Sequence, residues 1–290
     1  MRGWFFRAFA RVLSVVPVRL LHGLAHPLSA LIWRISRRLR TVARTNVALC
    51  YPDLSAEAQE QRARRSLYHY ACNALEVGVC WYAGRRRFDA LFDPPVGLEH
   101  VAAARDAGLG LVVMAPHFGA WELLGLSLSD LLAVTLYKPG SDPEVDAVLI
   151  ERRERFGATL VPANRRGLKA LMDRLKAAEP VGVLPDQEPT GGDGRFAPFF
   201  NVPALTGVLV PRLIQRSGAQ AVYAACVRGE RGRFQVHFIP AGEDLHSPDL
   251  DVALSALNRG VEAVIALAPD QYLWAYKRFR ARPEGQPKRY

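Results

Sequence analysis

The stretch APHFGAWE at residues 115–122 places a histidine, a glycine and a glutamate directly after an apolar run. The run Leu111–Ala115 is typical of a buried strand, and ligands of α/β sheets bind beyond the carboxyl ends of such strands. A Glu122 carboxylate that accepts from one ring nitrogen of His117 would leave the other nitrogen free to take a proton from a hydroxyl. The spacing therefore predicts a general base with an acidic partner. A capped turn without a chemical role is the alternative.

The sequence lacks the residues that characterise several other kinds of catalytic site. No GxSxG segment occurs, and none of the four cysteines lies at a predicted strand-to-helix turn, so no covalent acyl-enzyme is expected. The sequence has no HExxH segment, no CxxC pair and no second histidine near His117, which argues against a metal site. The chemistry that fits is direct attack by a substrate hydroxyl.

A basic cluster, ERRERFG at 151–157, lies at the end of a helix predicted over 144–156. Its simplest interpretation is a solvated helix face. Three arginines in five positions nevertheless put at least one on the inward side, where a phosphate could be held bidentately. The remaining charges suit an acidic protein partner. The cluster and its downstream continuation comprise Arg152, Arg153, Arg155, Arg165, Arg166 and Lys169.

The segment LPDQEPTGGDGRFAPFF at 184–200 is typical of a binding loop. It starts at a predicted strand end with Asp186, continues through glycines and ends in aromatic residues that include Phe196. A loop that only connects two elements rarely needs an acid at a strand end and three phenylalanines. We expect this segment to contribute to the substrate site.

Hydrophobic patterning after residue 95 alternates between helices and short apolar strands, which is typical of an α/β domain with a largely parallel central sheet. The predicted strands span 111–115, 133–137, 159–161, 181–184, 219–227 and 234–239. The predicted helices span 98–107, a short segment from 117, 144–156, 167–178, 204–217 and 252–267. Upstream, a helix is predicted from its N-cap Ser55 to Tyr82, and Asp93-Pro94-Pro95 is predicted as a loop.

Residues 1–52 hold nine arginines and no acidic residue, so they carry +9 of the net charge of +10. These arginines are interleaved with aromatic and aliphatic residues, which favours a membrane surface over nucleic acid as the partner. A spanning helix needs roughly 20 apolar residues, whereas the longest uncharged run, Leu20–Trp33, has 14 and contains Pro27. We expect an interfacial helix or helical hairpin. An amphipathic helix packed on the protein's own core is the alternative.

This division predicts an N-terminal membrane-associated segment over 1–44 and one catalytic domain over 45–290. The arginines at 34–40 would then face anionic headgroups on the cytoplasmic side.

The chain resembles the late acyltransferases of lipid A biosynthesis, the lauroyl and myristoyl transferases of Gram-negative bacteria, over nearly its whole length. An H-x4-E motif alone is shared with glycerolipid acyltransferases generally, and the C-terminal signature narrows the family. The stretches that carry the resemblance are TNVALCYPDLS (45–55), APHFGAWE (115–122), LYKPGSDPEVD (136–146), PDQ (185–187), RFAPFFNVPALT (195–206) and PDQYLWAYKRFRARPEGQPKRY (269–290).

The resemblance implies a glycerolipid-acyltransferase-like fold and transfer of a fatty acyl chain from acyl-acyl carrier protein to a hydroxyl of a lipid A precursor. It places this reaction at the cytoplasmic face of the inner membrane, with no metal and no organic cofactor. By motif position it implies that His117 is the general base and that Glu122 orients it. The substrate-site residues that we expect by the same route are Arg153, in preference to Arg155, with Asp186, Lys138, Phe196 and Arg278.

The sequence departs from the family pattern at two positions, with Lys138 in place of the usual arginine and Asn201 in place of a glycine. Relatives that acylate other lipids share the core motifs, so another glycolipid or phospholipid acceptor stays open. A non-catalytic protein that binds anionic membranes through its N-terminus is an alternative from a different class. A hydrolase, with water replacing the acceptor hydroxyl, is a third.

Overall fold

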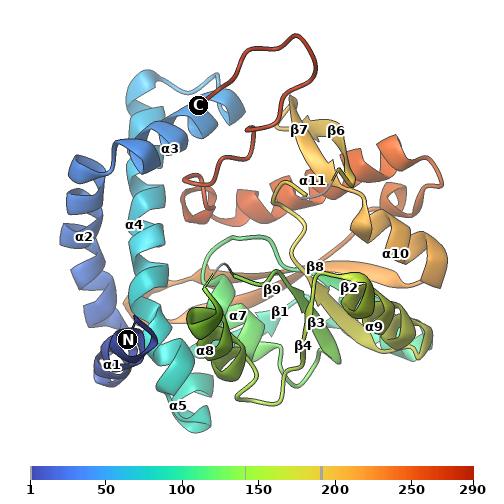
Figure 1. Cartoon of the computed structure of the whole chain (residues 1–290), viewed down its shortest axis with the longest axis horizontal. Coiled ribbons are helices and arrows are strands. Elements are labelled where there is room, and N and C mark those ends of the chain that lie inside the picture. Colours follow the sequence, from blue (N-terminus) through green and yellow to red (C-terminus); the bar gives the residue numbers. More distant parts are fainter. Residues whose placement is uncertain (1, 141, 190–191) are drawn as a thin grey trace.

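A seven-stranded sheet forms the centre of the computed structural model, which describes residues 2–140, 142–189 and 192–290 (Figure 1). The strands lie in the order β1-β9-β8-β2-β5-β3-β4, and neighbours run parallel except for β8 and β9. This confirms the predicted α/β class. The strands are β1 (Phe92–Val96), β2 (Leu111–Met114), β3 (Val134–Tyr137), β4 (Leu160–Pro162), β5 (Pro180–Val183), β8 (Gln220–Arg228) and β9 (Phe234–Pro240).

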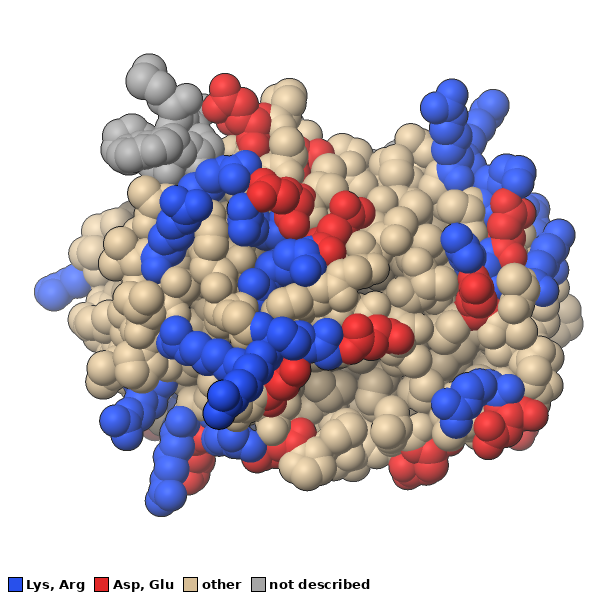
Figure 2. Space-filling view, turned by 90° about the horizontal axis from the view of Figure 1, so that it is seen from below, with Lys and Arg blue, Asp and Glu red and all other residues tan. Residues whose placement is uncertain are grey.

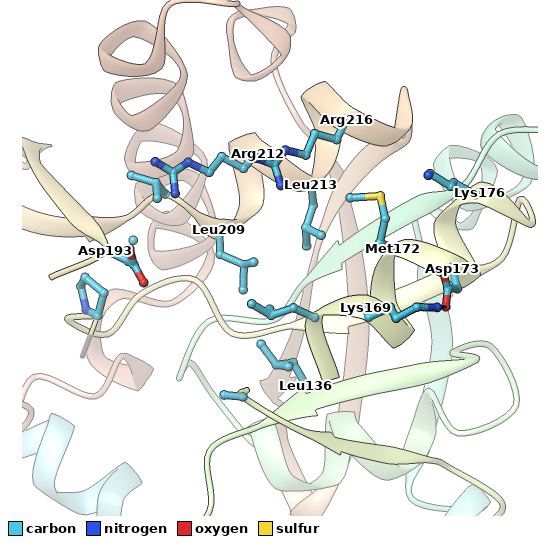
Figure 3. A pocket seen from close by; sticks show the side chains of 15 residues that line it. Leu136, Lys169, Met172, Asp173, Lys176, Asp193, Leu209, Arg212, Leu213 and Arg216 are labelled. Carbon is cyan, nitrogen blue, oxygen red and sulfur yellow. Dashed lines mark hydrogen bonds and ion pairs between the residues drawn. The ribbon is translucent and has the colours of Figure 1, made fainter. Parts of the chain in front are cut away.

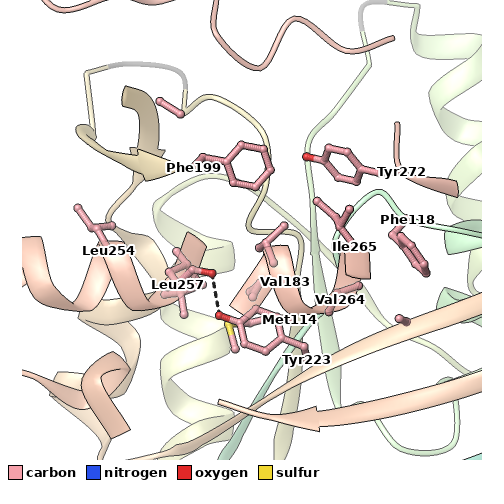
Figure 4. Packing of buried hydrophobic residues seen from close by; sticks show 14 of the residues in the cluster. Met114, Phe118, Val183, Phe199, Tyr223, Leu254, Leu257, Val264, Ile265 and Tyr272 are labelled. Carbon is pink, nitrogen blue, oxygen red and sulfur yellow. Dashed lines mark hydrogen bonds between the residues drawn. The ribbon is translucent and has the colours of Figure 1, made fainter. Parts of the chain in front are cut away.

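Helices cover both faces of the sheet because alternate residues of a buried strand point in opposite directions. On β2, Val112 and Met114 belong to one buried cluster, whereas Leu111 and Val113 belong to the other. Figure 4 shows part of the first cluster, between the sheet and α11. The helices that follow the first strand are α6 (Leu98–Asp106), α7 (Trp121–Ser127), α8 (Pro143–Arg153), α9 (Arg165–Lys176), α10 (Leu209–Ser217) and α11 (Leu250–Leu267).

The N-terminal helices form a layer along one side of the sheet (Figure 1). α1, α2 and α3 each pack against α4, a helix of 27 residues that begins at the predicted N-cap. The Ser55 hydroxyl accepts from the Ala58 backbone N–H at 3.2 Å. The boundary predicted at residue 44 falls inside α3. These helices are α1 (Arg2–Val15), α2 (Val18–Ile35), α3 (Arg37–Cys50) and α4 (Ala56–Tyr82), and the short α5 (Arg85–Asp89) follows them.

α1 and α2 present apolar side chains on two sides. Ala10, Leu21 and Ala25 are fully buried against the neighbouring helices. Packing on the protein's own core therefore accounts for one side only. The other side exposes between 51% and 72% of Phe9, Val12, Val15, Leu20, Leu24, Leu31 and Ile35. Within the described residues, no helix has the length and apolar character that a bilayer crossing requires.

Two stretches differ from the sequence-based prediction. Asp93-Pro94-Pro95, predicted as a loop, lies within β1 at the edge of the sheet, where a strand tolerates proline because one side has no partner. Residues 194–207 form an antiparallel hairpin of β6 (Gly194–Phe199) and β7 (Val202–Gly207), so α10 begins five residues later than predicted.

The turn of this hairpin explains one departure from the family pattern. Phe200 and Asn201 have φ values of 48° and 61°, as a two-residue hairpin loop requires. Asparagine adopts this left-handed conformation more readily than most residues, so Asn201 fits a position where the resemblance led us to expect glycine.

A buried ion pair joins α4 to β8. Glu76 is 1% exposed and accepts from two guanidinium nitrogens of Arg228, each at 2.7 Å, while His22 Nε2 lies 2.7 Å from the same carboxylate. Burial raises the pKa of Glu76, but Arg228 and His22 outweigh it and bring that pKa down to about 2. Ligand atoms of His22, Cys72 and Glu76 lie within 4.8 Å of one another. Because a guanidinium already occupies both carboxylate oxygens, this group fits an ion pair better than a metal site.

Glu76→Gln is expected to lower the free energy of unfolding at pH 7 by about 3–5 kcal/mol, because it leaves Arg228 buried without its counter-charge. The pKa of Glu76 in the folded chain lies below its ordinary value of 4.5. The stabilisation is therefore present above pH 4.5 and is lost as the pH falls toward 2. Urea unfolding at pH 7 and pH 3 measures this. Glu99→Gln, at an exposed carboxylate, is the control, and an unchanged free energy for E76Q at pH 7 would contradict the prediction.

Candidate active site

His117 and Asp186 meet at the carboxyl edge of the sheet because β2 and β5 are parallel neighbours in register. Met114 pairs with Val183, and each polar residue follows three positions later on its own segment. His117 Nδ1 lies 2.8 Å from Asp186 Oδ1, and the His117 backbone N–H donates to Asp186 Oδ2 at 3.0 Å. The carboxylate, whose side chain is 2% exposed, thus holds both the ring and the backbone of the histidine.

The turn that carries His117 is held from two sides. Gly119 has a φ of +57°, and a Cβ there would lie 2.0 Å from the Cys226 carbonyl oxygen, so only glycine fits. The Gly119 backbone N–H donates to the Gln271 carbonyl at 3.0 Å, and the Leu273 backbone N–H donates to the His117 carbonyl at 3.2 Å. β8 and the C-terminal segment therefore position the turn, which brings the stretches 115–122 and 269–290 into one site.

The hydrogen bonds around His117 define the roles of its two ring nitrogens. A carboxylate can only accept, so Nδ1 carries a proton toward Asp186, and Nε2 of the neutral ring is an acceptor. Gln187 Nε2 donates to that nitrogen at 3.1 Å. Burial raises the pKa of Asp186. The His117 ring, the hydrogen bonds from the ring and backbone N–H groups of His117, and the charge of Arg278 together outweigh burial and hold that pKa below its usual range. The site thus offers an ionised Asp186 behind His117 and one basic nitrogen in front of it.

Glu122 has a different partner from the one predicted. It lies in the first turn of α7, and its two carboxylate oxygens accept from Arg153 Nε at 3.0 Å and from a terminal guanidinium nitrogen at 2.5 Å. A bidentate guanidinium binds a carboxylate more strongly than a single imidazole N–H does. The predicted hydrogen bond between Glu122 and His117 is therefore wrong, because Asp186 on the neighbouring strand holds Nδ1 instead.

The Glu122–Arg153 pair still lies beside the histidine. Burial raises the pKa of Glu122, and Arg153 more than offsets this, with a further lowering from His117. Arg153 is thus the arginine of the basic cluster that faces inward, as the spacing predicted. Its side chain is 33% exposed, so part of the guanidinium stays open to solvent.

Three other predicted substrate-site residues are not bonded to this centre. Arg155 donates to the Ala83 carbonyl at 2.7 Å and stacks on the Phe156 ring at 4.0 Å. Lys138 is exposed directly after β3, and Phe196 is 39% exposed on β6. In the described part of the chain, none of the three makes a hydrogen bond or ion pair with His117 or Asp186.

Arg278 is 2% exposed, and protein groups occupy both terminal nitrogens of its guanidinium. It donates to the Leu205 carbonyl at 2.7 Å, to Thr206 Oγ1 at 3.1 Å and to Asn258 Oδ1 at 3.3 Å. The side chain thus ties the β6–β7 hairpin to α11. It acts on the site through its charge, which contributes to the lowered pKa of Asp186.

Two residues outside the predicted set complete the site. Gln187 contacts His117 Nε2, and its position directly after Asp186 at a strand end was the signal that could have identified it. Tyr272 forms an isolated β-bridge with Phe118, and burial together with Asp186 raises its pKa well above the usual value. No local pattern places Tyr272 here, because only the fold brings the C-terminal segment beside the histidine turn.

Comparison with known proteins identifies the family to which this site belongs. Residues 1–281 match the family described as Bacterial lipid A biosynthesis acyltransferase. Over 278 residues the chain is 27% identical to the lipid A biosynthesis lauroyltransferase of Escherichia coli (strain K12), an alignment that covers 95% of this chain and 90% of that protein.

Two further relatives from the same organism agree. The lipid A biosynthesis palmitoleoyltransferase is 28% identical over 293 residues, covering 99% of this chain and 94% of the relative. The lipid A biosynthesis myristoyltransferase is 25% identical over 262 residues, covering 89% and 80% respectively. The chain is an acyltransferase and belongs to the bacterial lipid A biosynthesis acyltransferase family.

Proposed function

We propose that this enzyme transfers a fatty acyl chain from acyl-acyl carrier protein to a hydroxyl of a lipid A precursor, with His117 as general base. The observation that carries the proposal is the hydrogen-bonded chain Asp186–His117–Gln187 at the carboxyl edge of the sheet. Membership of the lipid A acyltransferase family supports the acceptor class. The relatives are named for lauroyl, palmitoleoyl and myristoyl groups, so their names leave the acyl chain of this enzyme to experiment.

In the proposed reaction the acceptor hydroxyl displaces the Gln187 amide and donates its hydrogen bond to His117 Nε2. Nε2 takes the proton as the hydroxyl oxygen attacks the thioester carbonyl, and the Asp186 carboxylate stabilises the imidazolium that forms. Collapse of the tetrahedral intermediate breaks the C–S bond. The imidazolium returns its proton to the departing sulfur, which leaves an ester and a free thiol.

A reconstituted assay tests the proposal. The purified enzyme is mixed with an acyl-acyl carrier protein and a lipid A precursor in detergent, and mass spectrometry follows the acceptor. The expected result is an acceptor whose mass increases by one acyl group, together with free carrier thiol. Fatty acid release without an acylated acceptor would favour a hydrolase. Acylation of another glycolipid or phospholipid, with the lipid A precursor unchanged, would assign a different acceptor.

We further propose that α1 and α2 bind the cytoplasmic face of the inner membrane. Their exposed apolar side chains accompany nine arginines and no acid within residues 1–52, the combination that binds an interface rich in anionic lipid. An acceptor with long acyl chains stays in that interface, so the enzyme must reach it there.

The membrane proposal predicts that Val12→Gln/Val15→Gln/Leu20→Gln lowers binding to vesicles of phosphatidylglycerol and phosphatidylethanolamine by at least about tenfold. Each residue loses apolar burial worth about 0.8 kcal/mol per CH₂ group, and about 1.4 kcal/mol already corresponds to tenfold. Co-sedimentation measures the effect. Val252→Gln/Leu267→Gln, at exposed positions of α11, is the matched control. Equal sedimentation of both variants would argue against this face as the contact.

A further inference from the structure

A cavity of about 850 Å³ lies between α9 and α10, beside the active site and distinct from it. We call it the α9–α10 groove (Figure 3). Its apolar lining comprises Leu136, Leu168, Met172, Val208, Leu209 and Leu213. The cations at its rim are Lys169, Lys176, Arg212 and Arg216, all exposed. Two carboxylates, Asp173 and Asp193, also line the groove, so the cations outnumber the acids by four to two. An apolar floor with an excess of cations around it is a surface for an amphipathic and acidic partner.

Most of this positive charge has no protein counter-ion. Lys169 pairs with Asp173 at 2.5 Å. Within the described residues, Lys176, Arg212 and Arg216 form no hydrogen bond or ion pair through their side chains. These three cations can therefore pair with an acidic partner without breaking a contact inside the protein.

Two of the residues that line the groove lie near the active site in the sheet or in the chain. Leu136 is the penultimate residue of β3, at the same carboxyl edge that carries His117. Pro189 lines the groove and stands two residues after Gln187, which contacts His117 Nε2. A partner seated in the groove would therefore hold its cargo next to the general base.

The groove lies at the opposite end of the molecule from α1 and α2 (Figure 1). Figure 2 likewise shows Lys and Arg side chains gathered at both ends of one face, with one group on the side of α9 and α10. If α1 and α2 rest on the membrane, the groove lies at the end of the molecule away from the lipid headgroups. Its acidic occupant then comes from the aqueous phase and is not a lipid.

We propose that the α9–α10 groove docks the acidic acyl carrier protein and directs its thioester to His117. This inference rests on the proposed function, since it names the docking surface for the proposed donor. An amphipathic acidic helix of the carrier places its apolar face on the groove floor and its carboxylates against the rim cations. Such charge pairing sets the rate of encounter and selects the partner.

The test is Lys176→Glu/Arg212→Glu/Arg216→Glu, assayed with two donors of the same acyl chain. With acyl-acyl carrier protein, we expect KM to rise at least about tenfold at low salt, and the difference from wild type to shrink as salt is added. With the uncharged acyl-pantetheine thioester, we expect kcat/KM to stay at the wild-type value. The matched control is Arg86→Glu/Arg105→Glu/Lys288→Glu, which changes the net charge by the same amount at exposed positions elsewhere.

A binding measurement separates this proposal from the function on which it rests. Fluorescence anisotropy of labelled carrier protein with His117→Ala enzyme needs no turnover, and the charge reversal should weaken that binding at least about tenfold. An unchanged affinity would overturn the docking site even if acyl transfer is confirmed. An equal loss of kcat/KM with acyl-pantetheine would also overturn it, because the groove would then hold the acyl arm itself. A wild-type enzyme that transfers nothing from carrier protein would instead overturn the proposed function.

Discussion

Replacing His117 with alanine is expected to lower the rate constant of acyl transfer by at least about 10²–10⁴-fold while the chain stays folded. His117 Nε2 is the proposed proton acceptor, and alanine leaves no group within reach of the acceptor hydroxyl. The histidine side chain is 17% exposed and packs at the rim of the core, so its removal creates no large cavity. Single-turnover transfer from a saturating acyl donor gives the rate constant, and circular dichroism reports the fold.

The matched control for this variant is His246→Ala, a histidine in a short surface turn far along the chain from the site. It should retain wild-type activity. An H117A enzyme with full activity would refute the assignment of the base. If H117A also unfolds at a lower urea concentration, lost stability contributes to the lost activity. His117→Gln, which keeps the volume of the side chain, then separates the two effects.

Asp186→Asn is expected to lower kcat by about 10²–10⁴-fold, with a much smaller change from Glu122→Gln. Asp186 accepts from Nδ1 at 2.8 Å and from the His117 backbone at 3.0 Å, so the amide removes the charge that stabilises the imidazolium and the ring tautomer. Glu122 instead binds Arg153, and its loss frees a guanidinium beside the site. Parallel measurements of kcat and KM distinguish the two roles.

These two variants decide between the sequence-based and the structure-based assignment of the acidic partner. The structure predicts that D186N acts on kcat, because the defect lies in proton transfer. It predicts that E122Q acts mainly on stability and KM, because Glu122 holds Arg153 in place. The opposite pattern, with kcat lost in E122Q and kept in D186N, would restore Glu122 as the group that orients the histidine.

The basic cluster shows what a local sequence pattern can predict and what it cannot. Three arginines in five positions implied that one faces inward, and Arg153 does so. The spacing could not name the partner of that arginine, since the partner comes from another helix. The apolar alternation likewise predicted the parallel sheet, but it missed the β6–β7 hairpin, whose strands are short and contain prolines and small residues.

By itself, the sequence determined the α/β class, the strand end that carries His117, the charge asymmetry of the N-terminus and the resemblance to the lipid A acyltransferases. Each of these follows from neighbouring residues or from motifs. Only the tertiary structure decided that Asp186, and not Glu122, holds the histidine. That choice depends on which strands are neighbours, and pairing between β2 and β5 brings together residues 69 positions apart. Strand order arises from the packing of the whole chain, so no local spacing contains it.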